Sequence, residues 1–371
     1  MRKVYLTDTV DVAARNRIAW IFDEFERVTV SISGGKDSTV LCWLALREAH
    51  KRGRKIGVFF LDEEAVYMST VRQVRYLMEL CPENTEKMWV QFPFRLTNAT
   101  SFRDSQLLCW DAERETDWMR RKEPDSIQAP PWDVSRQYVK NKVKGFGFYD
   151  VLENFDRIAP DTAHLVGLRA DESLDRFRAV TRNPGYKDCV WSTAVHADGS
   201  ARFYPLYDWT FDDIWTFIAD NNIRYSPIYD YMYQKGMARQ EIRVSSLIHE
   251  KSFKSLVELP EFEPETFDKL MKRIGGVQTG NLYGKDDTVF RARKLPKNFA
   301  SWAEYRNFLL ETYPDADKKR VFAARFAAQG SGEAIARQQC RQLMLGDYEN
   351  NIPVKRKSAL SATVQKWRGL L

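Results

Sequence analysis

The sequence predicts an α/β protein with a parallel sheet and a mainly helical C-terminal region. Short segments rich in apolar and β-branched residues alternate with segments of helical periodicity over the first half of the chain. Strands that alternate with helices in this way are joined by crossover connections, which place the strands parallel. After about residue 235 the sequence contains no convincing strand, and residues 300–312 and 333–345 have helical patterns. We therefore expect two domains, residues 1–235 with the sheet and residues 236–371 with helices and a basic tail.

The individual elements follow from the spacing of the apolar residues. In the first domain we expect helices at residues 10–26, 38–51 and 66–80. We expect strands at residues 28–32, 56–61, 88–92 and 163–168. A further helix should begin at Thr210, because Thr210 and Asp213 have the spacing of a capping box in which aspartate replaces the usual glutamate.

Residues 93–150 interrupt the alternation of strands and helices. They contain four prolines, many cations and three isolated tryptophans, Trp110, Trp118 and Trp132. Because they follow the third strand directly, we expect an insertion at the edge of the sheet where α/β proteins bind ligands. Its mixture of cations and aromatics is either a lid that holds a base or a small satellite core under solvated charges.

Composition narrows the class of protein. The 371 residues carry a net charge of +6, which allows a nucleic-acid partner without requiring one. The five cysteines form no CxxC pair and the four histidines have no paired spacing, so we expect no iron–sulfur cluster, no zinc and no disulfide framework. The N-terminus is charged and no segment is long and apolar enough for a membrane span, so we expect a cytoplasmic protein without a membrane partner.

The strongest motif lies between the first strand and its helix. Two glycines allow a tight turn and a close approach to an anion, and the amides of the helix start can then bind phosphate oxygens. The predicted binding residues are Ser31, Ser33, Gly34, Gly35, Lys36, Asp37 and Ser38. Asp37 would repel a naked phosphate, so it either holds a magnesium ion or caps the loop. The spacing differs from that of a Walker loop.

Two further strand ends carry candidate residues. Arg169 follows the strand at 163–168, and its planar guanidinium suits phosphate or sulfate oxygens, although a surface ion pair with Asp171 or Glu172 would look the same. Asp62 follows the strand at 56–61 and either contacts the ribose or a metal ion or caps the next helix.

The motif Ser-Gly-Gly-Lys-Asp-Ser resembles the hallmark of the PP-loop superfamily, the N-type ATP pyrophosphatases with the adenine nucleotide alpha hydrolase-like fold. Residues 167–178 resemble the second motif of its phosphoadenosine phosphosulfate (PAPS) reductase and ATP sulfurylase branch, and residues 203–215 resemble the segment that closes the sheet domain. The second motif implies nucleotide contacts from Arg169, Asp171, Glu172, Ser173 and Arg176. Nearly the whole chain is similar to PAPS reductase-like proteins related to the regulator IbrA, through residues 108–111 and 274–284.

The resemblance implies ATP or PAPS as the ligand, with magnesium, and Lys36, Asp37 and Arg169 as the catalytic residues. The leading interpretation is ATP-dependent adenylation of an acceptor with release of pyrophosphate. The alternatives are a nucleotide-sensing regulator that acts with a ParB-like partner, and a PAPS or adenylylsulfate reductase. The reductase is disfavoured because its Glu-Cys-Gly-x-His motif is missing, and Cys340 stands in Arg-Gln-Gln-Cys-Arg-Gln, where we expect a structural role.

Overall fold

The structure of the chain is a computed structural model. It describes residues 7–101, 104, 106–134, 146–181, 185–193, 196, 198–239, 241–244, 246–249, 252–278, 292, 294–347, 350 and 354. The expected basic tail and residues 282–284 of the last similarity segment lie outside this part.

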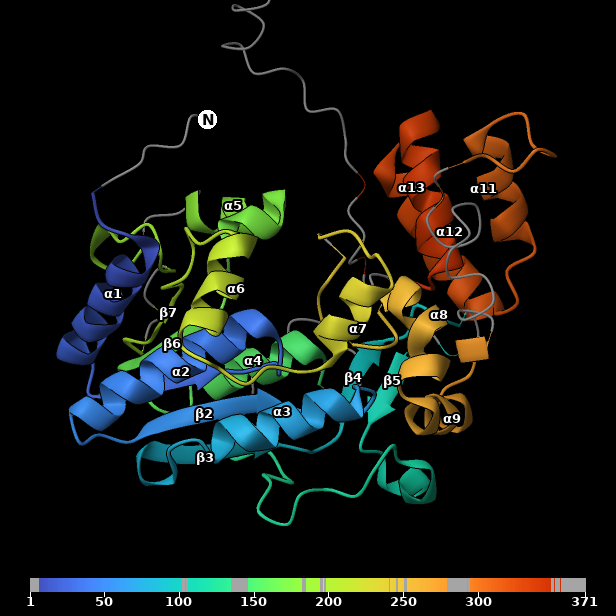
Figure 1. Cartoon of the computed structure of the whole chain (residues 1–371). Coiled ribbons are helices and arrows are strands. Elements are labelled where there is room, and N and C mark those ends of the chain that lie inside the picture. The colour runs from blue at the N-terminus through green and yellow to red at the C-terminus, as the bar shows by residue number, and fades with distance from the viewer. Residues whose placement is uncertain are drawn as a thin grey trace, which may run out of the picture. The chain divides into compact units, whose positions relative to one another are not determined.

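A five-stranded sheet forms the centre of the region up to about residue 235 (Figure 1). Its strand order is β3-β2-β1-β6-β7, and every neighbouring pair is parallel. The strands are β1 (Arg27–Ser31), β2 (Ile56–Leu61), β3 (Thr85–Val90), β6 (Thr162–Val166) and β7 (Ala201–Phe203). A separate two-stranded sheet pairs β4 (Phe94–Thr97) with β5 (Gln106–Cys109). The predicted α/β class with a parallel sheet is therefore confirmed.

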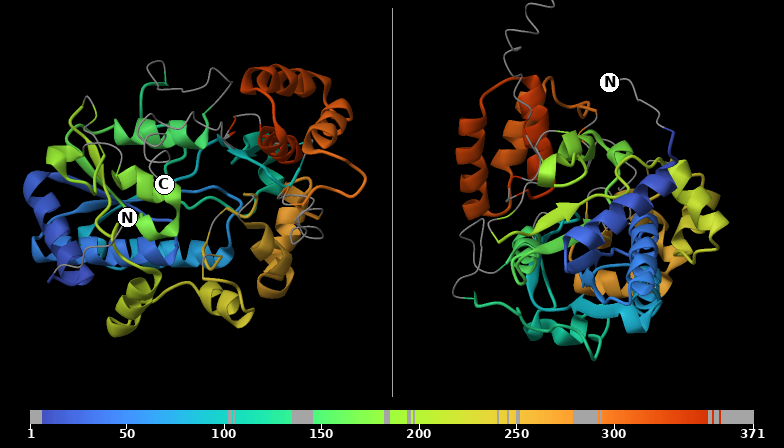
Figure 2. Two further views of the ribbon diagram at one scale, coloured as in Figure 1. Left: turned by 90° about the horizontal axis from the view of Figure 1, so that it is seen from above. Right: turned by 90° about the vertical axis from the view of Figure 1, so that its left-hand side faces the viewer.

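Helices cover both faces of the five-stranded sheet. The α-helices described in this region are α1 (Val10–Glu24), α2 (Lys36–Lys51), α3 (Met68–Met78), α4 (Phe148–Asp156), α5 (Leu174–Thr181), α6 (Phe211–Asp220) and α7 (Ile228–Gln234). In Figure 2, α2 and α3 lie on one face and α4 lies on the other. Successive side chains of β2 point to opposite faces, so Val58 and Phe60 join the main core while Phe59 packs on Phe155 of α4, with ring centroids 4.8 Å apart.

The chain divides into two compact units. The first contains residues 1–96, 108–246 and 261–269, and the second contains residues 97–107, 247–260 and 270–371. Later in the described part of the chain follow α8 (Phe253–Phe262), α9 (Pro264–Arg273), α11 (Trp302–Glu311), α12 (Ala316–Gln329) and α13 (Glu333–Met344). The predicted helical C-terminal region is confirmed, whereas the domain division between residues 235 and 236 stays a prediction. No helix of the described part combines the length and the apolar character that a membrane crossing requires.

Two local expectations have different outcomes. The capping box at the start of α6 is confirmed: the Thr210 hydroxyl accepts from the Asp213 amide at 3.2 Å, and the Asp213 carboxylate accepts from the Thr210 amide at 2.7 Å. Strand β7 has no counterpart among the strands expected from the sequence. Its three residues, one of them Arg202, are too few to show an alternating pattern, and they form a strand because β6 offers them a partner.

The insertion is fastened to the end of β2 by Asp62. This side chain is fully buried and pairs with Arg120, whose side chain is only 7% exposed. The Asp62 carboxylate also accepts from the indole of Trp89 and the amide of Gln91, both at 2.8 Å. From the insertion, the Trp110 indole donates to the Asp62 carbonyl at 2.8 Å. A buried carboxylate with this many donors is fully satisfied, and the insertion is held at the carboxyl edge of the sheet.

Asp62→Ala should lower the free energy of unfolding by about 3–5 kcal/mol, because it leaves the buried guanidinium of Arg120 without its partner. Urea denaturation measures this change. Asp117→Ala is the matched control, since its ion pair with Arg114 lies in the same insertion with both side chains over 40% exposed and should contribute less than about 1 kcal/mol. Equal losses in the two variants would contradict the anchoring role.

Candidate functional site

The candidate site lies where the strand order of the sheet reverses. From β1 the chain proceeds to β2 on one side, and the later strand β6 pairs with the other side of β1. Ser31, the last residue of β1, is in register with Val166, the last residue of β6. Open α/β sheets bind ligands beyond the carboxyl ends of the strands at such a switch point. The phosphate loop, residues 33–38, leaves β1 here, and Arg169 follows β6.

Two glycines allow the backbone to come together at this point. Gly34 has φ +69°, and a Cβ there would lie 2.9 Å from Thr70 Cγ2 and 3.1 Å from the Thr70 carbonyl oxygen. A Cβ on Gly167 would lie 3.1 Å from the Ser38 amide nitrogen and 3.2 Å from the Asp37 carbonyl oxygen. Only glycine fits both positions without a shift, so the first turn of α2 packs directly against the end of β6.

The loop is closed by hydroxyl groups and leads into an uncapped helix. The Ser38 hydroxyl donates to the Gly35 carbonyl at 3.0 Å and accepts from the Ser33 amide at 3.1 Å, and the hydroxyls of Ser33 and Ser38 lie 3.2 Å apart. Gly35 is the N-cap of α2 and has no side chain that could cap the first amides. The first amides of a helix have no acceptor within it, so they can bind an anion.

Asp37 joins the two predicted cations of the site. One carboxylate oxygen lies 2.5 Å from Nε of Arg169, and the other lies 2.9 Å from Nζ of Lys36. Lys36 is 2% exposed and Arg169 is 3% exposed, so both charges are held away from water. Arg169 also comes within 4.0 Å of Asp171 and Glu172, which are much looser contacts. The arrangement concentrates positive charge beside the positive end of the α2 dipole.

Aromatic residues from later in the chain complete the surroundings of Lys36. Its ammonium lies 5.4 Å from the ring centroid of Phe211 and 5.6 Å from that of Tyr229. The Lys36 amide donates to the Tyr229 hydroxyl at 2.9 Å. Burial, and then the charge of Asp37, raise the pKa of this hydroxyl well above its usual value, so it stays neutral. The neutral Tyr229 hydroxyl therefore accepts the hydrogen bond of one amide of the phosphate loop, that of Lys36.

The structure places the remaining predicted residues of the second motif outside the loop. The Ser173 hydroxyl accepts from the Arg176 amide at 3.2 Å at the start of α5, and Arg176 pairs with Glu172 at 2.7 Å. Glu172 connects them to the phosphate-loop side of the site, because its carboxylate pairs with Arg176 and also lies 4.0 Å from Arg169. Their contact with a nucleotide stays a prediction.

Asp62 anchors the insertion through its ion pair with Arg120. Its contact with a ribose or a metal ion stays a prediction. Asp62 does not cap the next helix, since the N-cap residue of α3 is Tyr67 and the Asp62 carboxylate accepts from the earlier Glu64 amide at 3.0 Å. The first amides of α3, those of Met68 and Ser69, donate instead to the carboxylate of Glu263 at 2.7 and 2.8 Å.

The magnesium ion predicted at Asp37 stays a prediction. Both carboxylate oxygens already pair with cations, Lys36 and Arg169. Within the described ranges, no group of three or more His, Cys, Asp or Glu side chains is placed to hold a metal ion. A magnesium ion at Asp37 would have to replace one of these two cations, which a bound polyphosphate could draw away from the carboxylate.

Sequence reasoning missed Tyr229 and the role of Gly167. Tyr229 lies 193 positions beyond Lys36, in a segment with no motif, and only the folded chain brings α7 to the loop. Gly167 stands at the start of the second motif, but its close approach to α2 depends on the pairing of β6 with β1.

Comparison with protein families identifies the sheet-bearing region. The model of the phosphoadenosine phosphosulfate reductase domain matches residues 27–279, and that of a domain of unknown function (DUF3440) matches residues 236–360. Among curated proteins, the uncharacterized protein YbdN of Escherichia coli (strain K12) is 32% identical over 326 residues, which cover 84% of this chain and 77% of YbdN.

Two solved structures are similar at low identity. PAPS reductase from Candida auris is 11% identical with a TM-score of 0.34, and the match covers 62% of this chain and 94% of that one. FMN adenylyltransferase from Candida glabrata is 16% identical with a TM-score of 0.34, and the match covers 62% and 63% of the two chains.

Gly167→Ala should move the first turn of α2 and lower the free energy of unfolding by about 1–3 kcal/mol, because the added methyl group meets backbone atoms that cannot rotate away. Gly147→Ala is the matched control, since its φ is −89° and its nearest contact is a flexible Asp150 oxygen at 3.4 Å. Chemical denaturation compares the two, and a Gly167→Ala variant as stable as the control would show that the contact tolerates a side chain.

Proposed function

The chain belongs to the phosphoadenosine phosphosulfate reductase domain family, and from this premise we propose that it is an ATP-dependent enzyme that adenylates an acceptor. The observation that carries the proposal is the buried pair of cations, Lys36 and Arg169, at the switch point of the sheet. Both are held by the single carboxylate of Asp37, next to the first amides of α2, which have no capping side chain on Gly35 and of which that of Lys36 donates to Tyr229. A polyphosphate can take over the contacts that Asp37 now makes.

In the proposed reaction an acceptor oxygen or nitrogen attacks the α-phosphorus of ATP. The bond from the α-phosphorus to the bridging oxygen breaks, the adenylyl group passes to the acceptor, and pyrophosphate leaves with the bond electrons. The acceptor's proton goes to the solvent. Negative charge grows on the pyrophosphate as the bond breaks, and Lys36, Arg169 and the loop amides are fixed donors for that charge. The protein need supply no nucleophile of its own.

The cysteines support transfer of an adenylyl group over sulfur reduction. A thiol attacks as the thiolate, so a reductase needs a cysteine with a low pKa. Burial raises the pKa of Cys340 to about 12, and burial also raises the pKa of Cys42, Cys81 and Cys189. Cys109 is buried and donates to the Glu63 carbonyl at 3.3 Å. In Cys42, Cys81, Cys189 and Cys340 the raised pKa favours the neutral thiol, which is a poor nucleophile.

Lys36→Ala should weaken ATP binding by about tenfold or more, because a charged hydrogen bond contributes about 1.5–3 kcal/mol. Isothermal titration measures the affinity, and thermal unfolding shows whether the fold is kept. Lys51→Ala is the matched control, since Lys51 ends the same helix with its side chain 74% exposed. Unchanged ATP affinity in a folded Lys36→Ala protein would remove the loop from the nucleotide site.

The products of turnover test the chemistry separately from the binding. Chromatography of labelled ATP incubated with candidate acceptors should reveal pyrophosphate and adenylated acceptor, both lost in Lys36→Ala. Release of ADP and phosphate instead would mean cleavage between the β and γ phosphates and would contradict the proposal.

Tyr229→Phe should bind ATP more tightly, by roughly tenfold at most, because a phosphate oxygen no longer has to displace the hydroxyl from the Lys36 amide and one hydrogen bond contributes about 1 kcal/mol. The ring and its contact with the Lys36 ammonium remain. Titration of ATP into both proteins gives the ratio. Weaker binding by the variant would show that the hydroxyl contacts the nucleotide in the complex.

A further inference from the structure

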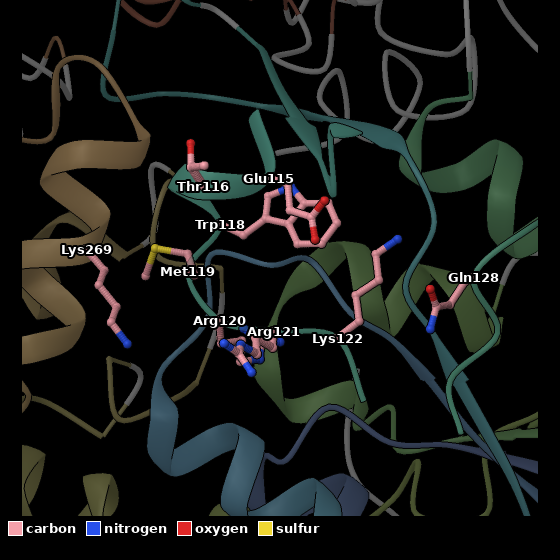
Figure 3. A pocket seen from close by; sticks show the side chains of 9 residues that line it. All are labelled: Glu115, Thr116, Trp118, Met119, Arg120, Arg121, Lys122, Gln128 and Lys269. Carbon is pink, nitrogen blue, oxygen red and sulfur yellow. The ribbon is translucent and has the colours of Figure 1, made fainter. Parts of the chain in front are cut away.

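A cavity of about 810 Å³ lies within the insertion and next to α9. Figure 3 shows the side chains that line it. Four of them are cationic, Arg120, Arg121, Lys122 and Lys269, and Glu115 is the carboxylate among the lining residues. Cavities of 300–1,000 Å³ hold small-molecule ligands, so the space is sufficient for a nucleotide.

Three of these cations are available to a ligand. Arg120 is neutralised by Asp62. Arg121, Lys122 and Lys269, by contrast, have no carboxylate within 4.0 Å in the part of the chain that the structure describes. Burial lowers the pKa of Lys122, which reflects the cost of holding its charge away from water. An anion in the cavity would offset that cost.

Trp118 provides a fixed aromatic surface in the same cavity. Its indole donates to the Asp111 carbonyl at 2.9 Å, and its ring meets that of Trp110 edge-on with centroids 5.5 Å apart. The Lys122 ammonium lies 4.9 Å from the Trp118 ring centroid. The other two tryptophans of the insertion serve its core: Trp110 is fully buried, and Trp132 packs on Phe155 at 5.3 Å. Trp118 is thus the one that lines the cavity.

One wall of the cavity is bonded to the carboxyl end of β2. Arg120 lines it and at the same time pairs with Asp62, which directly follows β2. Strand β2 is the neighbour of β1, from which the phosphate loop leaves. Neighbouring strands lie about 4.8 Å apart. The wall of the cavity and the phosphate loop therefore start from adjacent strand ends in the same compact unit.

We infer that this cavity binds a nucleotide, with the base against Trp118 and the phosphate among Arg121, Lys122 and Lys269. Stacking on an aromatic ring combined with unpaired cations is the chemistry by which proteins hold single nucleotides and single strands. That the bound nucleotide is the acceptor of the adenylyl group rests on the proposed function. Binding of a nucleotide in the cavity does not depend on it.

The test uses two probes on the full chain. A fluorescent single strand of about six thymidines is titrated by anisotropy, and free thymidine monophosphate competes with it. Lys122→Glu should weaken binding of the strand by roughly tenfold or more. Arg114→Glu is the matched control, because it makes the same charge change in the insertion at a residue that does not line the cavity, and it should stay within about twofold. Trp118→Leu should weaken binding by roughly fivefold or more through lost stacking.

Each outcome decides the inference. If free thymidine monophosphate competes with the oligothymidine, the cavity is a site for a mononucleotide. If the oligothymidine binds without such competition, the cavity holds a nucleotide of a nucleic-acid strand. Both outcomes support the inference. Equal losses in Lys122→Glu and Arg114→Glu would reduce the effect to overall charge and overturn it, as would failure of the wild-type chain to bind either probe. Lys36→Ala should keep strand binding while losing ATP. A Lys36→Ala protein that loses the strand, with the cavity variants unaffected, would place the strand at the loop.

Discussion

One carboxylate, that of Asp37, determines the geometry of the candidate site. It lies in the first turn of α2 and pairs with Lys36 from its own turn and with Arg169 from the end of β6. Two buried cations at this spacing would repel each other without it, and each would face a desolvation cost that its partner now offsets. The same contact connects the two strand ends that flank the switch point, so the loop and the second motif form one site.

The contact of Asp37 with Arg169 requires two segments of backbone to lie close together. Gly167 lets β6 end against α2, and Gly34 lets the loop turn beside Thr70. The insertion depends on a second buried ion pair, Asp62 with Arg120, one strand away. The two pairs differ in exposure of the carboxylate: the Asp37 side chain is 13% exposed, whereas that of Asp62 is fully buried. A ligand can thus reach the Asp37 carboxylate, as the proposed exchange of its partners requires, while Asp62 is suited to a structural role.

Much of the fold and part of the site could be predicted from the sequence. Apolar periodicity located β2 without error and α2 to within two residues at its start, because a buried parallel strand and an amphipathic helix leave local patterns. The positions of the loop and of Arg169 beyond strand ends could be predicted because both directly follow apolar segments, whereas their binding of a nucleotide stays a prediction. The role of Asp62 and the contact of Tyr229 could not be found, since both depend on partners 58 and 193 positions away.

A crystal structure of the chain with a non-hydrolysable ATP analogue tests most directly whether Asp37 gives up its cations to a nucleotide. Phosphate oxygens should bind the first amides of α2 and the side chains of Lys36 and Arg169, with at least one of the two Asp37 ion pairs opened and the Tyr229 hydroxyl displaced. A nucleotide bound elsewhere, with the contacts of Asp37 and Tyr229 unchanged, would contradict this exchange.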